Sequence, residues 1–140
     1  MENCIFCKII NKEIPSSIVY EDDDVLAILD ISQATPGHTL VMPKKHYQNF
    51  LSTPHDMMHK VMDVAQRIGM AQISVLHADG VNILSNVNEA AGQSVMHYHV
   101  HVIPRYLKNN NGLELSFTDQ ANLTDLNLPA LANKISKGIK

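Results

Sequence analysis

The chain has 140 residues, of which 45% are hydrophobic and 18% are charged, a composition typical of one soluble globular domain. The formal net charge of −3 argues against a nucleic-acid-binding surface. No stretch approaches the roughly 20 apolar residues of a membrane span, and the opening MENCIFCKII lacks the pattern of a signal peptide. We therefore expect a single-domain cytoplasmic protein over residues 1–140, with its two cysteines as reduced thiols or metal ligands.

The predicted elements describe strands arranged around one strong helix. In chain order they are a helical turn, three strands, a long helix, two strands and a terminal helix, over residues 4–15, 16–21, 24–31, 37–43, 53–72, 80–86, 94–104 and 128–139. The long helix is indicated by apolar residues at helical spacing between Met57 and Ala71, with Thr53 as its expected N-cap. This pattern predicts an α+β domain with an antiparallel sheet.

The last predicted strand contains three alternating histidines, His97, His99 and His101, within QSVMHYHVHVIPR. Side chains alternate between the faces of a strand, so the three rings share one face while the intervening residues pack against the core. At about 3.3 Å per residue, the outer two histidines lie roughly 13 Å apart along the backbone. Because a metal–imidazole bond is only about 2.1 Å long, the three rings are better suited to separate roles than to one metal ion.

A neutral imidazole can attack phosphorus, since its reference pKa of about 6.5 leaves it largely unprotonated at pH 7. A second imidazole nearby can stabilise the charge on the phosphoryl oxygens. Gly92, Gln93 and Ser94 stand directly before the histidines. The glycine permits close approach of a ligand, and the other two residues offer hydrogen-bond donors to a phosphate.

The segment HYHVHVI resembles the signature of the histidine triad (HIT) family. Further segments resemble that family in the same order, CIFCKIINKEIP, LDIS, PGHTLVMPKKH and NEAAGQSVMHYHVHVIPR. The resemblance covers about residues 4–106, and residues 107–140 form a C-terminal extension that is not diagnostic. It implies an α+β HIT-like fold with a five-stranded antiparallel sheet, one long helix and short terminal helices. It also implies a homodimer, for which we expect the helix from Met57 to Ala71 to form the interface.

The resemblance implies a hydrolase or nucleotidyl transferase that acts at the α-phosphate of an adenosine-type nucleotide. His99 would be the nucleophile that forms a nucleotidyl-histidine intermediate, His101 would support the phosphate, and Gln93 and Ser94 would contact phosphate oxygens and the leaving group. The implied nucleotide-binding residues are Asp30, Ile31, Asn86, Gly92, Gln93, Ser94, His99 and His101, with Asp30 on the ribose hydroxyls. HVIPR resembles the branch that cleaves dinucleoside polyphosphates and CIFCKII the branch that cleaves nucleoside phosphoramidates, so the leaving group stays open.

The pair Cys4 and Cys7 forms a C-x-x-C motif that can present two thiolates to zinc. The resemblance implies a closed structural site completed by His46 and His97, and no metal is required for the chemical step. The alternative is a pair of buried reduced thiols, with His46 hydrogen-bonded to His97.

Two other functions are compatible with the same residues. One is a nucleotide-binding regulatory or interaction module with little turnover, and the other is an adaptor whose zinc is purely structural. The intact triad and its Gly-Gln-Ser neighbours favour the enzyme. The other histidines, His38, His55, His59 and His77, are expected to be polar residues of the surface or of a helix face.

Overall fold

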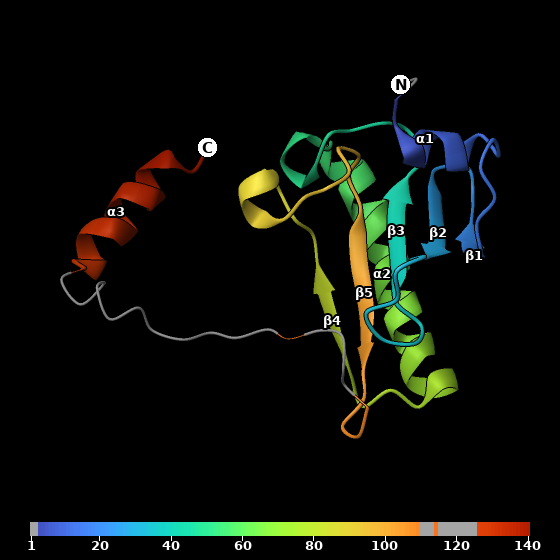
Figure 1. Ribbon diagram of the computed structural model, residues 1–140. Coiled ribbons are helices and arrows are strands. Elements are labelled where there is room, and N and C mark those ends of the chain that lie inside the picture. The colour runs from blue at the N-terminus through green and yellow to red at the C-terminus, as the bar shows by residue number, and fades with distance from the viewer. Residues whose placement is uncertain (1–2, 110–113, 115–125) are drawn as a thin grey trace.

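One five-stranded antiparallel sheet forms the frame of the protein. The computed structural model describes residues 3–109, 114 and 126–140, and the strands follow the order β1-β2-β3-β5-β4 (Figure 1). The strands are β1 (Ile18–Glu21), β2 (Val25–Leu29), β3 (Thr39–Pro43), β4 (Gly80–Leu84) and β5 (Val100–Arg105). The helices are α1 (Ile5–Ile10), α2 (His55–Leu76) and α3 (Leu128–Gly138), with 3₁₀ turns η1 (Phe50–Ser52) and η2 (Glu89–Ala91). The predicted α+β architecture is confirmed.

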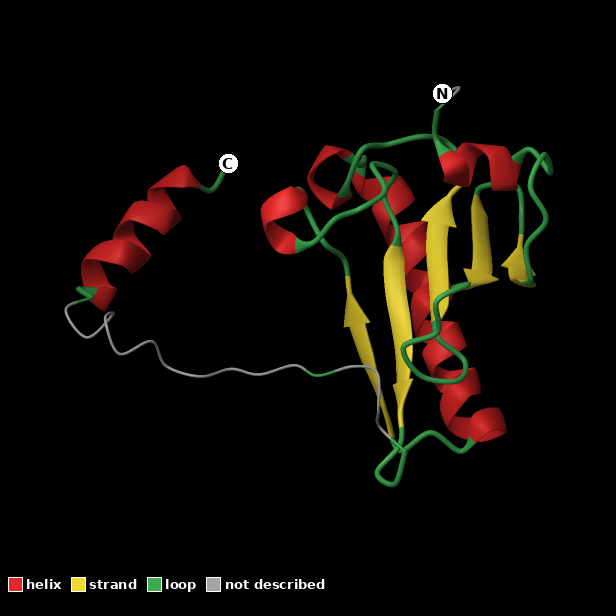
Figure 2. Cartoon of the chain, in the orientation of Figure 1, coloured by secondary structure: helices red, strands yellow, loops and turns green. Residues whose placement is uncertain are grey.

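The long helix α2 runs along one face of the sheet, behind the strands in the view of Figure 2. Its buried residues recur at intervals of three and four, which is one face of a helix: Val61, Val64, Ala65, Ile68, Gly69 and Gln72. The predicted cap is wrong, because Pro54 is the N-cap residue and the Thr53 hydroxyl donates to the carbonyl of Asn49 instead. The helix continues beyond the predicted end to Leu76, where His77 adopts the left-handed conformation that closes it.

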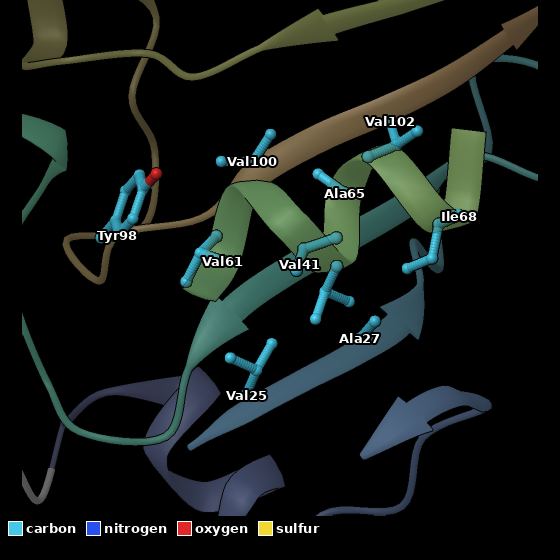
Figure 3. Close-up of a cluster of buried hydrophobic side chains, with 10 residues drawn as sticks. Val25, Ala27, Val41, Val61, Ala65, Ile68, Tyr98, Val100 and Val102 are labelled. Atoms are coloured by element: carbon cyan, nitrogen blue, oxygen red, sulfur yellow. The ribbon is translucent and has the colours of Figure 1, made fainter. Parts of the chain in front are cut away.

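The main core lies between α2 and the sheet (Figure 3). Alternate residues of β2, β3 and β5 point toward the helix, and Tyr98 extends this row beyond the start of β5. The cluster comprises Val25, Ala27, Val41, Val61, Val64, Ala65, Ile68, Tyr98, Val100 and Val102. Because interiors are close-packed, truncating one of these valines to alanine should cost about 1–3 kcal/mol.

The opposite face of the sheet is covered by α1 and carries a second apolar cluster. Its members are Cys4, Phe6, Ile9, Leu26, Ile28, Leu40 and Met42. Since β2 and β3 are packed on both faces, they read as continuous apolar runs in the sequence. Leu40 pairs with His101 in the β3–β5 ladder, so the triad side faces the α1 cluster.

The terminal helix α3 begins at Asn127, whose side-chain oxygen accepts a hydrogen bond from the Ala130 amide at 3.1 Å. It matches the predicted helix over 128–139 and buries none of its residues. The rest of the predicted C-terminal extension includes residues 110–113 and 115–125, which lie outside the described residues. None of the described helices combines the length and the apolar character needed to cross a membrane.

Candidate active site and metal cluster

Only the last part of the triad segment belongs to the sheet. β5 begins at Val100, so His101 lies on a strand while His97 and His99 precede it. The predicted strand begins too early, because the Tyr98 amide donates to a loop carbonyl rather than to a neighbouring strand. The predicted alternation is present: the residues between the histidines are in the α2 core, and the rings of His99 and His101 lie side by side with centroids 5.0 Å apart.

Four side chains from separate parts of the chain bring metal-binding atoms together beside α1. Nδ1 of His97 lies 3.5 Å from Sγ of Cys4, 3.6 Å from Sγ of Cys7 and 3.1 Å from Nδ1 of His46. Sγ of Cys7 lies 3.4 Å from Nδ1 of His46. The four predicted ligand atoms therefore converge within 4.8 Å of one another.

The hydrogen bonds of His97 leave its Nδ1 lone pair for this cluster. Nε2 lies 2.9 Å from the carbonyl oxygen of Pro43, so the proton is on Nε2. A carbonyl behind the ring is the usual outer partner of a ligating histidine. Zinc bonds of about 2.05 Å to nitrogen and about 2.3 Å to sulfur place tetrahedral ligands about 3.3–3.8 Å apart, close to the spacing here. In the alternative without a metal ion, His46 Nδ1 donates a hydrogen bond to His97 Nδ1 across the same 3.1 Å contact.

The middle histidine, His99, has one ring nitrogen that is free to act as a nucleophile. Its Nδ1 lies 2.7 Å from the carbonyl oxygen of His97, which assigns the proton to Nδ1 and leaves the lone pair on Nε2. The ring of Phe6 meets His99 edge-on with centroids 5.0 Å apart. Nε2 has no partner among the described residues, and it is not one of their buried unpaired atoms, which are Gln72 Oε1 and Tyr98 Oη. This nitrogen is therefore accessible to a ligand.

The third ring, His101, contacts a histidine that the sequence did not indicate. His38 is 5% exposed, so its expected place at the surface is wrong. Its Nε2 lies 2.9 Å from Nδ1 of His101 and 3.5 Å from Oδ2 of Asp30. Its Nδ1 accepts a hydrogen bond from the Ala34 amide at 3.1 Å. Only the pairing of β3 with β5 brings His38 to the triad, and no local sequence pattern shows that pairing.

Asp30, His38 and His101 also place possible metal ligands within 4.8 Å of one another. Their hydrogen bonds do not suit a metal. The Ala34 amide occupies the lone pair of His38 Nδ1, so Nε2 carries the proton and has no lone pair for an ion. Of the two clusters within the described part of the chain, the one with both cysteines therefore has the donor set for zinc.

Gln93 supports the loop before the triad. Its side-chain nitrogen donates to the carbonyls of Gln48 and Val95 at 2.8 and 3.1 Å, and its oxygen accepts from the Asn88 amide at 2.8 Å. It is 4% exposed. The side chain therefore fixes the loop through backbone groups, and its contact with a phosphate stays a prediction.

The other predicted nucleotide-binding residues flank the triad loop or follow β2. Gly92 has a φ of +92°, a conformation that favours glycine, and its carbonyl accepts from the Asn86 side chain at 3.5 Å. Ser94 lines a cavity of about 560 Å³ that also touches the metal cluster. Ile31 is fully exposed beside Asp30. The contacts of these residues with a nucleotide remain predictions.

Burial keeps the site histidines neutral. It lowers the pKa of His101 to about 4, with the neighbouring rings of His99 and His38 acting in the same direction. Burial likewise lowers the pKa of His99 and of His38, although the Asp30 carboxylate opposes both shifts. At neutral pH the site therefore offers uncharged rings, which suits both nucleophilic attack and hydrogen bonding.

This burial predicts a loss of stability in weak acid. Below pH 6.5 the unfolded chain binds a proton at His101 that the folded chain excludes until about pH 4, so the free energy of unfolding falls as pH falls. For one ring that is partly open to solvent, we expect a loss of about 1–2 kcal/mol between pH 7 and pH 5. Urea unfolding at both pH values should show a smaller loss for His101→Gln, whereas His59→Gln on the exposed side of α2 should behave like the wild type. Equal losses in all three proteins would contradict the assignment.

Comparison with known proteins agrees with this geometry. The HIT domain profile matches residues 11–108. Protein hit of Bacillus subtilis is 50% identical over 109 residues, which are 78% of this chain and 75% of that protein. Adenylylsulfatase HINT3 of Arabidopsis thaliana is 40% identical over 103 residues, which are 74% of this chain and 52% of that protein.

Two solved structures are similar over nearly the whole chain. A HIT family protein from Bacillus anthracis superposes with a TM-score of 0.89 at 42% identity and covers 99% of both chains. A zinc-bound histidine triad family protein from Mycobacterium smegmatis gives a TM-score of 0.73 at 41% identity and covers 97% of this chain and 98% of that one. The fold and the triad site define a histidine triad protein. This chain belongs to the HIT family.

Proposed function

We propose that this protein is a nucleotide hydrolase or nucleotidyl transferase that acts at the α-phosphate of an adenosine-type nucleotide through His99. The observation that carries the proposal is the hydrogen bond from His99 Nδ1 to the His97 carbonyl, which leaves an accessible lone pair on Nε2. A ring held in this tautomer can attack phosphorus without losing a proton first. HIT family membership supports the proposal.

The proposed reaction has two displacements. In the first, the Nε2 lone pair of His99 forms a bond to the α-phosphorus, the bond to the leaving group breaks, and the leaving group departs with that electron pair and takes a proton. In the second, water attacks the same phosphorus, loses a proton and breaks the bond to Nε2, which restores neutral His99 and releases the nucleoside monophosphate. An acceptor other than water would make the same step a nucleotidyl transfer.

The neighbouring residues would hold the substrate in line for these steps. We assign the phosphate oxygens to His101 and Ser94, and to Gln93 if one of its side-chain N–H groups turns from the carbonyl of Gln48 or Val95 to the ligand. The ribose hydroxyls are assigned to Asp30, whose Oδ2 lies 3.5 Å from His38 Nε2 beside the triad. Ile31, Asn86 and Gly92 would contact the nucleoside and phosphate from the flanking loops. The leaving group is a nucleotide or an amine, as in dinucleoside polyphosphates or phosphoramidates, and the adenylyl group in the name of the Arabidopsis relative is compatible with the same reacting phosphorus.

We further propose that Cys4, Cys7, His46 and His97 hold a structural zinc ion. The converging lone pairs and the spacing of 3.1–3.6 Å support it, and a similar protein from Mycobacterium smegmatis is zinc-bound. Such an ion would tie α1 to the start of the triad segment and would take no part in the reaction.

The protein is proposed to act as a cytoplasmic homodimer. Cys4 and Cys7 are placed as metal ligands and not as a disulfide, which favours a reducing compartment. Large apolar side chains on the outside of α2, among them Met62, Met70 and Ile73, are 38%, 66% and 45% exposed and would be covered by a second copy. A monomeric mass in sedimentation equilibrium would refute the dimer.

The covalent intermediate provides the direct test. Wild-type protein mixed with adenosine phosphoramidate or diadenosine tetraphosphate and quenched in the steady state should gain the mass of one AMP group, because attack at the α-phosphorus transfers that group to His99. Peptide mapping should place the group on the triad peptide. Nucleotide binding without any adduct or turnover would identify a binding module instead, and zinc without nucleotide affinity would identify an adaptor.

A further inference from the structure

We infer that Asn88 is a positioning residue whose strained backbone sets the loop that carries Gln93 and Ser94, the residues assigned to the phosphate. Asn88 has a φ of +68° and a ψ of +164°, a conformation that is almost confined to glycine. The role toward a phosphate rests on the proposed function. The geometry of the loop does not rest on it, and it can be tested in the protein without substrate.

The conformation of Asn88 is costly, and burial of its side chain does not account for it. At positive φ the Cβ of an L residue crowds the backbone, although asparagine is tolerated there better than most residues. The side chain of Asn88 is exposed, so core packing does not hold it in place. Residues in such conformations persist only where the surrounding structure fixes them, and they cluster at functional sites. The contacts of Asn88 must therefore explain its conformation.

Hydrogen bonds join Asn88 to Gln93 in both directions. The Asn88 N–H donates to Oε1 of Gln93 at 2.8 Å, and the Asn88 carbonyl accepts from the Gln93 amide at 3.1 Å. The same carbonyl also accepts from the Ala91 amide at 3.1 Å. Because φ and ψ set the directions of the N–H and the carbonyl, relaxing Asn88 to a negative φ would turn at least one of these groups away from Gln93.

The loop is also held from outside by two consecutive residues, Gln48 and Asn49. The Gln48 carbonyl accepts from Nε2 of Gln93 at 2.8 Å, and Nδ2 of Asn49 donates to Oδ1 of Asn88 at 3.4 Å. Asn49 is itself fixed, because it is 8% exposed and its side-chain oxygen accepts from two amides of η1. These contacts offset the cost of the strained conformation, and they place Asn88 and Gln93 on the same support.

The conformation of Asn88 also determines where the residues after it lie. Asn88 and Gly92, with φ of +68° and +92°, enclose the single turn η2. Gln93 and Ser94 follow this turn directly, and Ser94 lines the cavity beside the metal cluster. A relaxed Asn88 would shift both residues. Because in-line attack is sensitive to displacements of about 1 Å, such a shift should lower activity although no reacting group is removed.

The test compares Asn88→Gly with Asn88→Ala. Glycine adopts this φ and ψ without strain, whereas alanine keeps the Cβ and loses the acceptor for Asn49. We expect Asn88→Gly to melt at or above the wild type, and Asn88→Ala to melt about 3 °C or more below Asn88→Gly. kcat/KM toward adenosine phosphoramidate should fall about 10-fold or more in Asn88→Ala and stay within about threefold of the wild type in Asn88→Gly.

This order of the two variants distinguishes positioning by the backbone from a structural role of the side chain. At an ordinary position glycine destabilises more than alanine, because it loses more conformational freedom on folding. The matched control is the next residue, Glu89, which is exposed and has no positive φ. Glu89→Ala should be at least as stable as Glu89→Gly, and both should keep full activity. An Asn88→Gly protein that is less stable and less active than Asn88→Ala would overturn the inference.

NMR of the Gln93 side chain gives a readout that needs no substrate. Both N–H groups of its amide donate to carbonyls, at 2.8 and 3.1 Å, so their proton signals should exchange slowly with water. Asn88→Gly should keep these slow signals and Asn88→Ala should lose them. Unchanged signals in a folded Asn88→Ala protein would show that Asn88 does not position Gln93. If no form turns over nucleotide but the signals and melting temperatures follow the expected order, the proposed function is refuted and the positioning of the loop is supported.

Discussion

The His99→Ala protein should lose about 10⁴-fold or more of the wild-type kcat toward adenosine phosphoramidate and diadenosine tetraphosphate. The replacement removes Nε2 of His99. Among the ring nitrogens of the triad, this is the one that carries no proton and is also accessible to a ligand. His101 cannot replace it, because the hydrogen bond with His38 assigns the proton of His101 to its Nε2. Steady-state rates at saturating substrate measure the loss, and intact mass should show no AMP adduct.

Nucleotide binding should survive this replacement. The His99→Ala protein therefore distinguishes a role of His99 in the chemical step from a role in substrate binding. The AMP affinity of His99→Ala should stay within about tenfold of the wild type, because one lost contact costs about 1 kcal/mol. His77→Ala, an exposed residue after α2, should keep full activity. Equal rates for His99→Ala and the wild type would remove His99 from the mechanism, and a triad that binds nucleotide without turnover would then be the correct description.

Loss of the zinc cluster should produce the largest change in stability. We expect Cys7→Ser to abolish zinc binding and to lower the melting temperature by about 10 °C or more. Structural zinc contributes several kcal/mol to folding, and each kcal/mol is worth about 2–4 °C in a chain of this size. The reason is local: the cluster joins α1 to His46 and His97, which otherwise hold each other through a single 3.1 Å contact. Metal analysis and thermal unfolding of protein purified without chelator measure both effects.

Lys8→Ser is the matched control, since it makes the same kind of replacement at the next, exposed position of α1. It should keep one zinc per chain and melt within about 3 °C of the wild type. Wild-type protein purified without chelator but containing no zinc would disprove the site. A Cys7→Ser protein that still binds zinc and melts normally would show that the thiols are only packed beside the histidines.

Much of the fold was predictable, since its elements depend on short-range patterns. The buried stripe of α2 follows a helical period, and β2 and β3 are apolar runs because both of their faces are covered. The residues at which the helices and strands begin were less predictable from the sequence. Thr53 was expected to cap α2, but its hydroxyl bonds to Asn49 in the preceding turn. The strand before His101 was expected to begin at residue 94, but a strand ends where its hydrogen-bonding partners end, and local sequence does not contain that information.

The sequence by itself determined which chemical groups this protein has: three histidines on alternate residues, two cysteines three positions apart, and the period that buries their neighbours. What each ring nitrogen can do was decided only by tertiary structure, because a histidine's proton goes to whichever nitrogen faces an acceptor. The Pro43 carbonyl directs His97 toward the cysteines, the His97 carbonyl frees Nε2 of His99, and His38 turns His101 into a donor. These partners come from β3, from the triad backbone itself and from the loop before β3, and the folded sheet alone brings them together.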